Sequence, residues 1–310
     1  MATSHTYEEK LPSGKPVIFR GAATALVTPF TDGRVDTDCM RRLVRRQVDA
    51  GISALIAAGT TGESATLTHD EVLAVTEAVA AEADGNVPVI ACIGGNDTSK
   101  CLRLAKETSR LGIDAVMAVT PYYNKTTGEG LLAHFTAIAD ASPKPLLVYN
   151  VPPRTSMTIP LNVYTKLAEH ENIIGVKEAS ADVGLAADII CACGSSLSLY
   201  SGCDELTLPF LTLGGQGVIS VTSNIFPGEV ESMCRAYFNG DITEARRLQR
   251  ILHPLSRALF SKPNPIPVKA ACGLLGLCEP EVRLPLVQYD DVTQMEAVIN
   301  TTKEALSANA

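Results

Sequence analysis

Residues 173–180 read IIGVKEAS, and the rest of the chain is organised around this stretch. Its β-branched residues surround Gly175 in a short apolar run, a pattern typical of a strand that is buried on both faces. The run ends in Lys177, and a lysine at the mouth of an apolar strand is seldom buried without a partner or a task. Desolvation disfavours the charged ammonium, and a neutral amine is a nucleophile toward carbonyl carbon. Lys177 is therefore a candidate nucleophile, although the octapeptide fits equally a lysine that reaches water or pairs with Glu178.

Residues 173–180 are one of eight short apolar runs in the chain. The runs are 23–30, 53–59, 87–94, 115–121, 145–152, 173–180, 197–202 and 217–223. Their starts lie 20 to 34 residues apart, and the intervals carry helical spacing, as in 36–51 and 68–83. Eight strand-helix units in series predict an α/β fold of the (β/α)8 TIM-barrel type. A doubly wound open sheet is the alternative, but it usually has about five or six strands and often a glycine-rich turn after the first, which is missing here.

The ends of two intervening helices carry capping signals. Asp36 is a predicted N-cap, and Gly51 is a predicted C-cap of the same helix. Thr68 is followed three residues later by Glu71, which predicts a capping box.

The strand signal stops near Gly240, and three segments with helical spacing follow. These segments are 241–260, 266–276 and 291–308. They predict a C-terminal three-helix domain, and because no long linker precedes it we expect it to pack on the barrel. The expected organisation is a polar tail over 1–16, a catalytic barrel over 17–240 and a helical domain over 241–310.

The composition of the 310 residues argues against several classes of partner. The net charge of −8 argues against nucleic acid, and no stretch approaches 18 consecutive apolar residues, so we expect no membrane partner and a cytoplasmic location. The nine cysteines are odd in number and include no CxxC pair, which is typical of reduced thiols. Cys191 and Cys193 form a CxC pair without a second pair or a histidine cluster, so we expect no metal site.

Polar residues follow several of the apolar runs, where a barrel enzyme carries its active site. They are Thr60, Thr61, Gly62, Glu63 and Ser64 after the second run, Tyr122 and Tyr123 after the fourth, Tyr149 and Arg154 around the fifth, Lys177, and Gly202 with Asp204 after the seventh. Each has a purely structural explanation, since a tyrosine can be a core residue and an arginine a surface charge. Residues 59–64 can be a simple turn into a capped helix. They are not a phosphate loop, because they lack its GKS or GKT ending.

Taken together, these side chains fit one reaction. A lysine forms a Schiff base with a ketone, and a nearby tyrosine hydroxyl can move the protons that the addition and dehydration steps require. Threonine and a second tyrosine can relay those protons, while arginine offers a planar fork to a carboxylate. The combination predicts an aldolase-type site for an oxo acid.

Six motifs make the chain resemble the dihydrodipicolinate synthase and N-acetylneuraminate lyase family, from Gly21 to about Leu284. The motifs are GTTGESATL (59–67), TPYYN (120–124), YNVPPRT (149–155), GVKEAS (175–180), GGQGVISVTSN (214–224) and NPIPVK (264–269). The resemblance implies a TIM barrel with a C-terminal helical domain. It also implies class I aldolase chemistry in which pyruvate is bound covalently as a substrate and no cofactor is needed.

The resemblance also assigns roles to individual residues. It implies that Lys177 forms the Schiff base, that Tyr149 donates and accepts protons, and that Thr60 and Tyr123 complete a relay. It further implies that the pyruvate and the lysine are held by Thr61, the backbone of Ile219 and Gly202.

Arg154 favours one branch of the family. The synthases carry an arginine at this place of YNVPxRT for the carboxylate of L-aspartate 4-semialdehyde, so the expected reaction is its condensation with pyruvate, in lysine and diaminopimelate biosynthesis. The alternative is an N-acetylneuraminate lyase or another pyruvate-dependent oxo-sugar-acid aldolase, because SGCDE (201–205) departs from the SGDD of many synthases. A barrel that only binds a pyruvate-like ligand would be expected to have lost Lys177 or Tyr149.

The resemblance has two further implications. It implies a homotetramer, a dimer of dimers, in which Tyr123 enters the neighbour's site. It also implies a possible allosteric lysine site formed by Ser64, Ala65, His69, Asn96, Lys100 and Tyr122. Lys100 stands where lysine-sensitive members have a glutamate and Val72 where they have a second histidine, so we expect this chain to resist inhibition by lysine.

Overall fold

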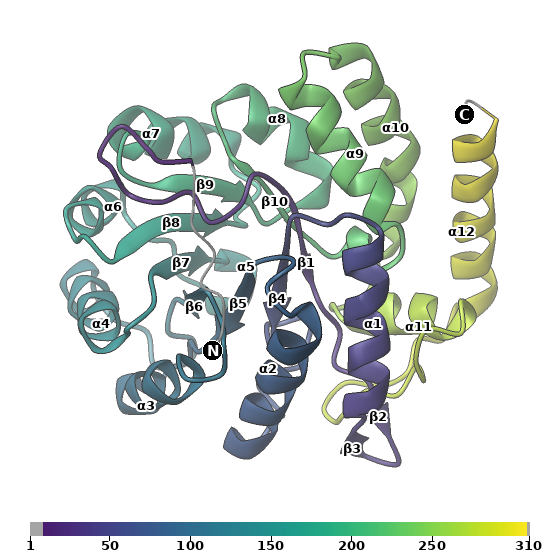
Figure 1. The fold of residues 1–310 in the computed structure, drawn as a ribbon, viewed down its shortest axis with the longest axis horizontal. Coiled ribbons are helices and arrows are strands. Elements are labelled where there is room, and N and C mark those ends of the chain that lie inside the picture. The colour runs from purple at the N-terminus through teal and green to yellow at the C-terminus, as the bar shows by residue number, and fades with distance from the viewer. Residues whose placement is uncertain (1–8, 309–310) are drawn as a thin grey trace.

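A computed structural model describes residues 9–308, in which eight parallel strands form a closed barrel (Figure 1). The strands are β1 (Gly21–Ala25), β4 (Ala54–Ala57), β5 (Val89–Cys92), β6 (Ala115–Val119), β7 (Leu146–Asn150), β8 (Ile173–Glu178), β9 (Ser198–Ser201) and β10 (Gly217–Ser220). Strand β1 pairs with both β4 and β10, and this closes the barrel. Each predicted apolar run overlaps one strand of the barrel, so the predicted TIM barrel is confirmed.

Helices surround the barrel and follow the strands in turn (Figure 1). They are α1 (Thr37–Asp49), α2 (His69–Ala83), α3 (Thr98–Thr108), α4 (Gly128–Ala141), α5 (Pro152–Thr155), α6 (Leu161–Ala168), α7 (Val183–Cys193), α8 (Thr207–Thr212) and α9 (Pro227–Phe238). Asp36 caps α1, and Thr68 forms the predicted capping box with Glu71 at α2. The predicted C-cap of α1 is wrong by one residue. Ala50 is the C-cap, and Gly51 follows it with a φ of 78°, which glycine adopts without steric cost.

The three predicted C-terminal helices are confirmed as α10 (Ile242–Ala258), α11 (Ile266–Leu274) and α12 (Val292–Ser307). Helix α10 packs on α9 and α12, so the region lies against one side of the barrel (Figure 1). The domain limit at 240 falls in the turn between α9 and α10 and stays a prediction. Part of the predicted polar tail, residues 1–8, lies outside the described residues.

A short hairpin of β2 (Phe30–Thr31) and β3 (Arg34–Val35) follows β1 and was not predicted. Asp32 and Gly33 form its turn with φ values of 51° and 76°. An Asp-Gly pair is a strong signal for such a turn, but strands of two residues carry no detectable alternation.

The interior of the barrel is filled near the amino ends of its strands. Ile18 and Phe19 lie shortly before β1 in the chain and belong to the apolar cluster inside the barrel. The Phe19 ring stacks on Tyr200 with centroids 4.2 Å apart, and the Tyr200 hydroxyl donates to the Phe19 carbonyl at 2.9 Å. The carboxyl ends of the strands form the opposite, open end of the barrel.

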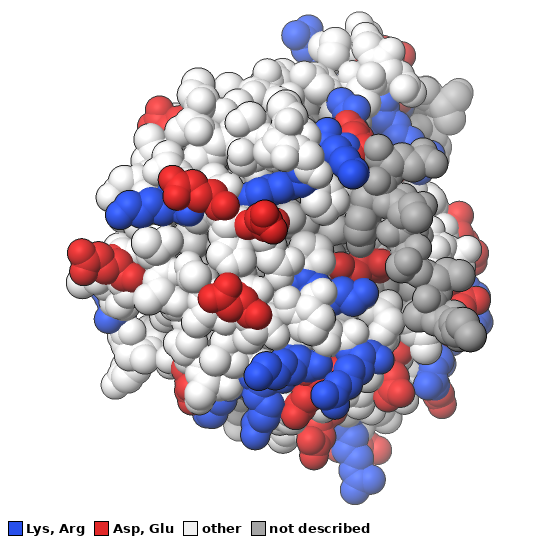
Figure 2. Space-filling model, turned by 60° about the vertical axis from the view of Figure 1, so that its left-hand side comes forward, with Lys and Arg blue, Asp and Glu red and all other residues white. Residues whose placement is uncertain are grey.

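On the face shown in Figure 2, acidic and basic side chains are interspersed among large uncharged areas. The described part of this face carries no broad surface of a single sign. Within residues 9–308, no helix is long and apolar enough to cross a bilayer.

Candidate active site

A cavity of about 780 Å³ opens at the carboxyl ends of the strands. Six predicted site residues line it, namely Thr60, Thr61, Tyr149, Arg154, Lys177 and Gly202. They come from the loops after β4, β7 and β9 and from strands β7 and β8 themselves. Residues far apart in the sequence therefore share one cavity.

Lys177 is buried beside Tyr149. The register of β7 and β8 places the two residues opposite each other, and Lys177 Nζ lies 4.4 Å from the centroid of the Tyr149 ring. Lys177 is 6% exposed, and no ion pair among the described residues involves it. Lys177 therefore neither pairs with Glu178 nor extends to the outer surface, but lines the cavity.

Glu178 points to the other side of β8 and has its own partners. Its carboxylate accepts from Asn150 Nδ2 at 2.9 and 3.1 Å, from the Tyr164 hydroxyl at 3.0 Å and from the Ser180 N–H at 2.7 Å. Burial, together with this carboxylate, raises the pKa of Tyr164 well above its usual value, so Tyr164 stays a donor. These contacts hold the ends of β7 and β8 together next to Tyr149 and Lys177.

Gly202 leaves room for the lysine. A Cβ at this position would lie 2.5 Å from Cβ of Ala179 and 3.1 Å from Cε of Lys177. Its backbone N–H donates to the Glu178 carbonyl at 2.7 Å. The structure thus gives Gly202 a steric role beside Lys177.

Two thiols border the amine. Burial raises the pKa of Cys92 to about 12 and that of Cys203 to about 11, against the opposing influence of the Lys177 charge. Neither thiol is ionised near neutral pH, so neither competes with the amine as a nucleophile. Across the described residues, no group of three or more histidine, cysteine or acidic side chains is arranged to hold a metal ion.

The loop after β4 carries the two threonine hydroxyls of the site. Thr28 Oγ1 donates to the Gly62 carbonyl at 2.7 Å, and Asn264 Nδ2 donates to Thr61 Oγ1 at 2.9 Å. Thr61 is 3% exposed, so its hydroxyl is held at the cavity wall.

Asn264 was not predicted as a site residue. It lines the cavity, and its carbonyl also accepts from Arg154 Nη2 at 2.8 Å. Asn264 therefore connects the threonine loop to the arginine at the end of α5. The NPIPVK motif was a signal for this position, but its contact with Thr61 spans 203 residues.

Two predicted residues lie apart from the cavity wall. Tyr123 is 93% exposed and has a φ of 69°, so within one chain it does not reach Lys177. Ile219 is buried in β10, where it pairs with Ala23, and the role expected of it concerns its backbone.

Asp204, in the stretch SGCDE, is buried and fully engaged by the protein. One carboxylate oxygen accepts from the Ser220 hydroxyl and the other from the Val221 N–H at 3.0 Å. Burial raises its pKa against these hydrogen bonds. The contacts tie the loop after β9 to the end of β10.

The residues of the possible allosteric lysine site lie around α2 and α3, outside the cavity. They are Ser64, Ala65, His69, Asn96, Lys100 and Tyr122. His69 forms a short contact with Glu107, and the Lys100 side chain is 74% exposed with Nζ 3.9 Å from the Asp97 carboxylate. Val72 is buried in α2.

The model of the dihydrodipicolinate synthetase family matches residues 18–304. The chain belongs to this family. A 4-hydroxy-tetrahydrodipicolinate synthase from Pelobacter propionicus is 44% identical over 277 residues, which are 89% of this chain and 96% of the relative. Among solved structures, dihydrodipicolinate synthase from Thermotoga maritima is 41% identical with a TM-score of 0.90, covering 93% of this chain and 99% of that one. The enzyme from Cyanidioschyzon merolae, solved with lysine bound, is 40% identical with a TM-score of 0.89, covering 92% and 99%.

Proposed function

We propose that this family member is a 4-hydroxy-tetrahydrodipicolinate synthase, which condenses pyruvate with L-aspartate 4-semialdehyde through a Schiff base on Lys177. One observation carries the proposal. Lys177 is buried at the end of β8 against the ring of Tyr149, and none of the ion pairs found within residues 9–308 includes it. A lysine in such a place is suited to attack a carbonyl carbon.

The reaction begins when Nζ of Lys177 adds to the ketone carbon of pyruvate. Loss of water then gives the Schiff base, with Tyr149 moving the protons. Loss of a proton from the methyl group gives an enamine, whose carbon attacks the aldehyde of the second substrate. Because the product is cyclic, the amino group of that substrate finally replaces Nζ at the former ketone carbon. This series of steps needs no cofactor, since the lysine itself activates the ketone.

The cavity wall favours the amino-acid semialdehyde over a sugar acid. Arg154 offers a fork for the carboxylate of the semialdehyde beside Asn264. Asp204 belongs to SGCDE, the stretch that left the lyase alternative open, but both of its carboxylate oxygens are engaged by Ser220 and Val221 and are not available to a sugar acid. Initial rates with L-aspartate 4-semialdehyde and with N-acetylneuraminate, each measured separately, distinguish the two. Faster turnover of N-acetylneuraminate would favour the lyase.

Borohydride reduction in the presence of pyruvate tests the covalent step. Mass spectrometry should find the reduced adduct on Lys177 in the natural sequence and none in Lys177→Ala. An adduct that persists on another lysine of the variant would overturn the assignment. Arginine at this place should not restore the adduct, because a guanidinium stays protonated.

We also infer a cytoplasmic homotetramer in which Tyr123 acts in a neighbouring site. The support is that Tyr123 is almost fully exposed although TPYYN is one of the family motifs. Because Tyr123 does not line the cavity of its own chain, its hydroxyl would complete the relay in a neighbouring chain.

A further inference from the structure

A buried ion pair outside the cavity joins the C-terminal region to the loop after β4. Lys269 Nζ lies 2.8 Å from Glu63 Oε1, and the two side chains are 0% and 1% exposed. Removing two charges from water is costly, and the cost is offset only when the geometry is good and the other polar atoms are satisfied. A pair this deeply buried therefore fixes the position of its partners closely.

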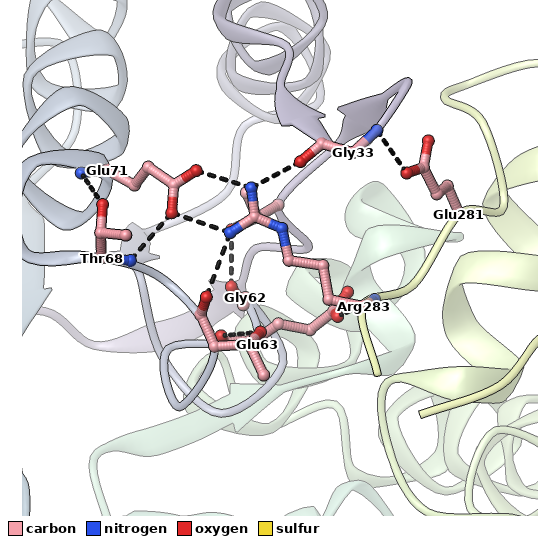
Figure 3. Close-up of polar contacts among 9 residues, drawn as sticks. Gly33, Gly62, Glu63, Thr68, Glu71, Glu281 and Arg283 are labelled. Atoms are coloured by element: carbon pink, nitrogen blue, oxygen red, sulfur yellow. Dashed lines mark hydrogen bonds and ion pairs between the residues drawn. The ribbon is translucent and has the colours of Figure 1, made fainter. Parts of the chain in front are cut away.

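Arg283, in the segment after α11, is a further partner of Glu63 (Figure 3). Its backbone N–H donates to Glu63 Oε2 at 2.9 Å, so both carboxylate oxygens of Glu63 are used. Its guanidinium binds Glu71 through two hydrogen bonds of 2.6 and 2.7 Å and donates to the Gly33 carbonyl at 2.7 Å. The Gly33 N–H in turn donates to Glu281 at 2.6 Å.

The unpredicted hairpin supplies the surface on which these cations rest. Phe30 is fully buried, with Lys269 Nζ 4.0 Å and Arg283 Cζ 4.4 Å from its ring centroid. Cations over an aromatic face are attracted by its quadrupole, and more strongly when water is excluded. Both cations thus lie against the ring of Phe30, and Glu63 pairs with the Lys269 ammonium.

The pair acts on the turn that carries the site threonines. Glu63 has a φ of 57°, a left-handed conformation that its side-chain contacts help to maintain. Its N–H donates to the Thr60 carbonyl at 3.1 Å, which closes the turn. From the other side Asn264, five residues before Lys269, holds the Thr61 hydroxyl.

We propose that Glu63 and Lys269 are positioning residues that set the place of the Thr60 and Thr61 hydroxyls relative to Lys177. The C-terminal region is then a working part of the site. This inference rests on the proposed function, because it assigns those hydroxyls to the Schiff-base chemistry. Neither Glu63 nor Lys269 lines the cavity.

Glu63→Gln is the informative variant. The amide keeps the shape of the carboxylate, but its NH2 group must face either the Lys269 ammonium or the Arg283 N–H, so one contact is lost. Lys269 also loses the negative charge that opposes the effect of burial on its pKa. We expect the turn to shift, and a misplacement of about 1 Å can lower a rate by about 100-fold.

Glu231→Gln is the matched control. Glu231 is also a buried carboxylate, 3% exposed, that accepts from the Ala22 N–H, Ser53 Oγ and Arg235 Nε, each at 2.8 Å. Ala22 and Ser53 lie at the amino ends of β1 and β4, the far end of the barrel from the cavity. This variant should lose stability in the same way without moving the threonine turn.

The test compares the natural sequence with both variants. It measures Tm, and then, at a temperature well below each Tm, kcat and the rate at which borohydride traps pyruvate on Lys177. We expect Glu63→Gln to lower kcat and the trapping rate by about 10- to 100-fold, while Glu231→Gln keeps the natural rates. Natural rates in Glu63→Gln, or equal losses in both variants, would overturn the inference.

The same data separate this inference from the proposed function. If the natural sequence traps no pyruvate on Lys177, the proposed function fails. If it traps pyruvate and Glu63→Gln does so equally fast, only the inference fails. Should Glu63→Gln not fold, Glu63→Asp replaces it, because this variant keeps the buried negative charge but is one methylene too short to hold both Lys269 Nζ and the Arg283 N–H without moving the turn. It should give a smaller loss of kcat of the same kind, and natural kcat would overturn the inference.

Discussion

Lys177 and Tyr149 occupy paired positions on neighbouring strands, so the backbone register alone brings their side chains together. Alternation along β8 sends Glu178 to the opposite side, where it holds Asn150 and Tyr164. The amine is thus separated from the nearest carboxylate in the sequence.

Tyr149→Phe tests the proton transfer at this residue. Removing the hydroxyl should lower kcat by roughly 10²- to 10⁴-fold, the range typical of general acid-base groups, with a smaller effect on pyruvate binding. Steady-state kinetics with both substrates measure this. Tyr237→Phe, on the outer helix α9, is the control and should keep the natural kcat. An unchanged kcat in Tyr149→Phe would exclude it as the proton carrier.

Arg154→Ala tests the contact with the second substrate. Loss of a charge-assisted hydrogen bond should cost about 1.5 to 3 kcal/mol, or roughly 10- to 150-fold in kcat/KM for the semialdehyde. Pyruvate affinity should change little. Arg154→Lys keeps the charge but loses the fork, so it should recover only part of the loss. An equal loss of pyruvate affinity would contradict this division of roles.

At the scale of elements, the segment after α11 connects three parts of the chain. Glu281 and Arg283 bind Gly33 in the hairpin, and Arg283 also binds Glu71 in the first turn of α2. The same Glu71 closes the capping box with Thr68. One carboxylate thus serves both the start of a barrel helix and the attachment of the C-terminal region.

Arg283→Gln should make the stability less dependent on pH. The hydrogen bonds from Arg283, more than any other cause, lower the pKa of Glu71 from 4.5 to about 2. Because the pKa is depressed in the folded state, the stabilisation is full above about pH 4.5 and is lost as the pH falls toward 2. The variant should therefore lose more free energy of unfolding at pH 6 than at pH 3, on the order of 1 kcal/mol for this partly exposed pair.

Urea denaturation at the two pH values measures this difference. A double-mutant cycle with Glu71→Gln separates the pair from other effects of the substitution. A loss in Arg283→Gln that is equal at pH 3 and pH 6 would show that the pair does not titrate as described.

At the scale of the whole molecule, exposed Tyr123 predicts a site shared between chains. Tyr123→Phe and Lys177→Ala chains should each be nearly inactive alone. Mixed together, they should regain part of the activity, because some hybrid dimers hold one complete site. Activity of the mixture is the measurement, and verified subunit exchange without recovery would contradict a shared site.

Resistance to lysine is the second prediction at this scale. Lys100 would place a like charge near a bound lysine and remove a charge-assisted hydrogen bond, which should lower affinity by roughly two or three decades. Initial rates at saturating pyruvate during a lysine titration test this, and half-inhibition below about 1 mM would contradict it. Lys100→Glu with Val72→His should create sensitivity, whereas Lys106→Glu, an exposed change on the same helix, should not.

The sequence by itself determined the number and order of the eight barrel strands, the caps at Asp36 and Thr68, and the place of Lys177 at a strand end. These features depend on neighbours a few residues away, and the periods of strands and helices record them directly. The catalytic assignments depended on motifs that follow strand ends, where barrel geometry makes distant residues converge.

Only the tertiary structure decided which distant side chains support the site. Asn264 meets Thr61 across 203 residues, and Lys269 meets Glu63 across 206. Neither contact leaves a periodic trace, because each depends on how α11 packs against the barrel. The exposure of Tyr123 is likewise a property of the folded surface. A local pattern specifies which face of an element is buried, but only the packing of complete elements specifies which buried charge finds its partner.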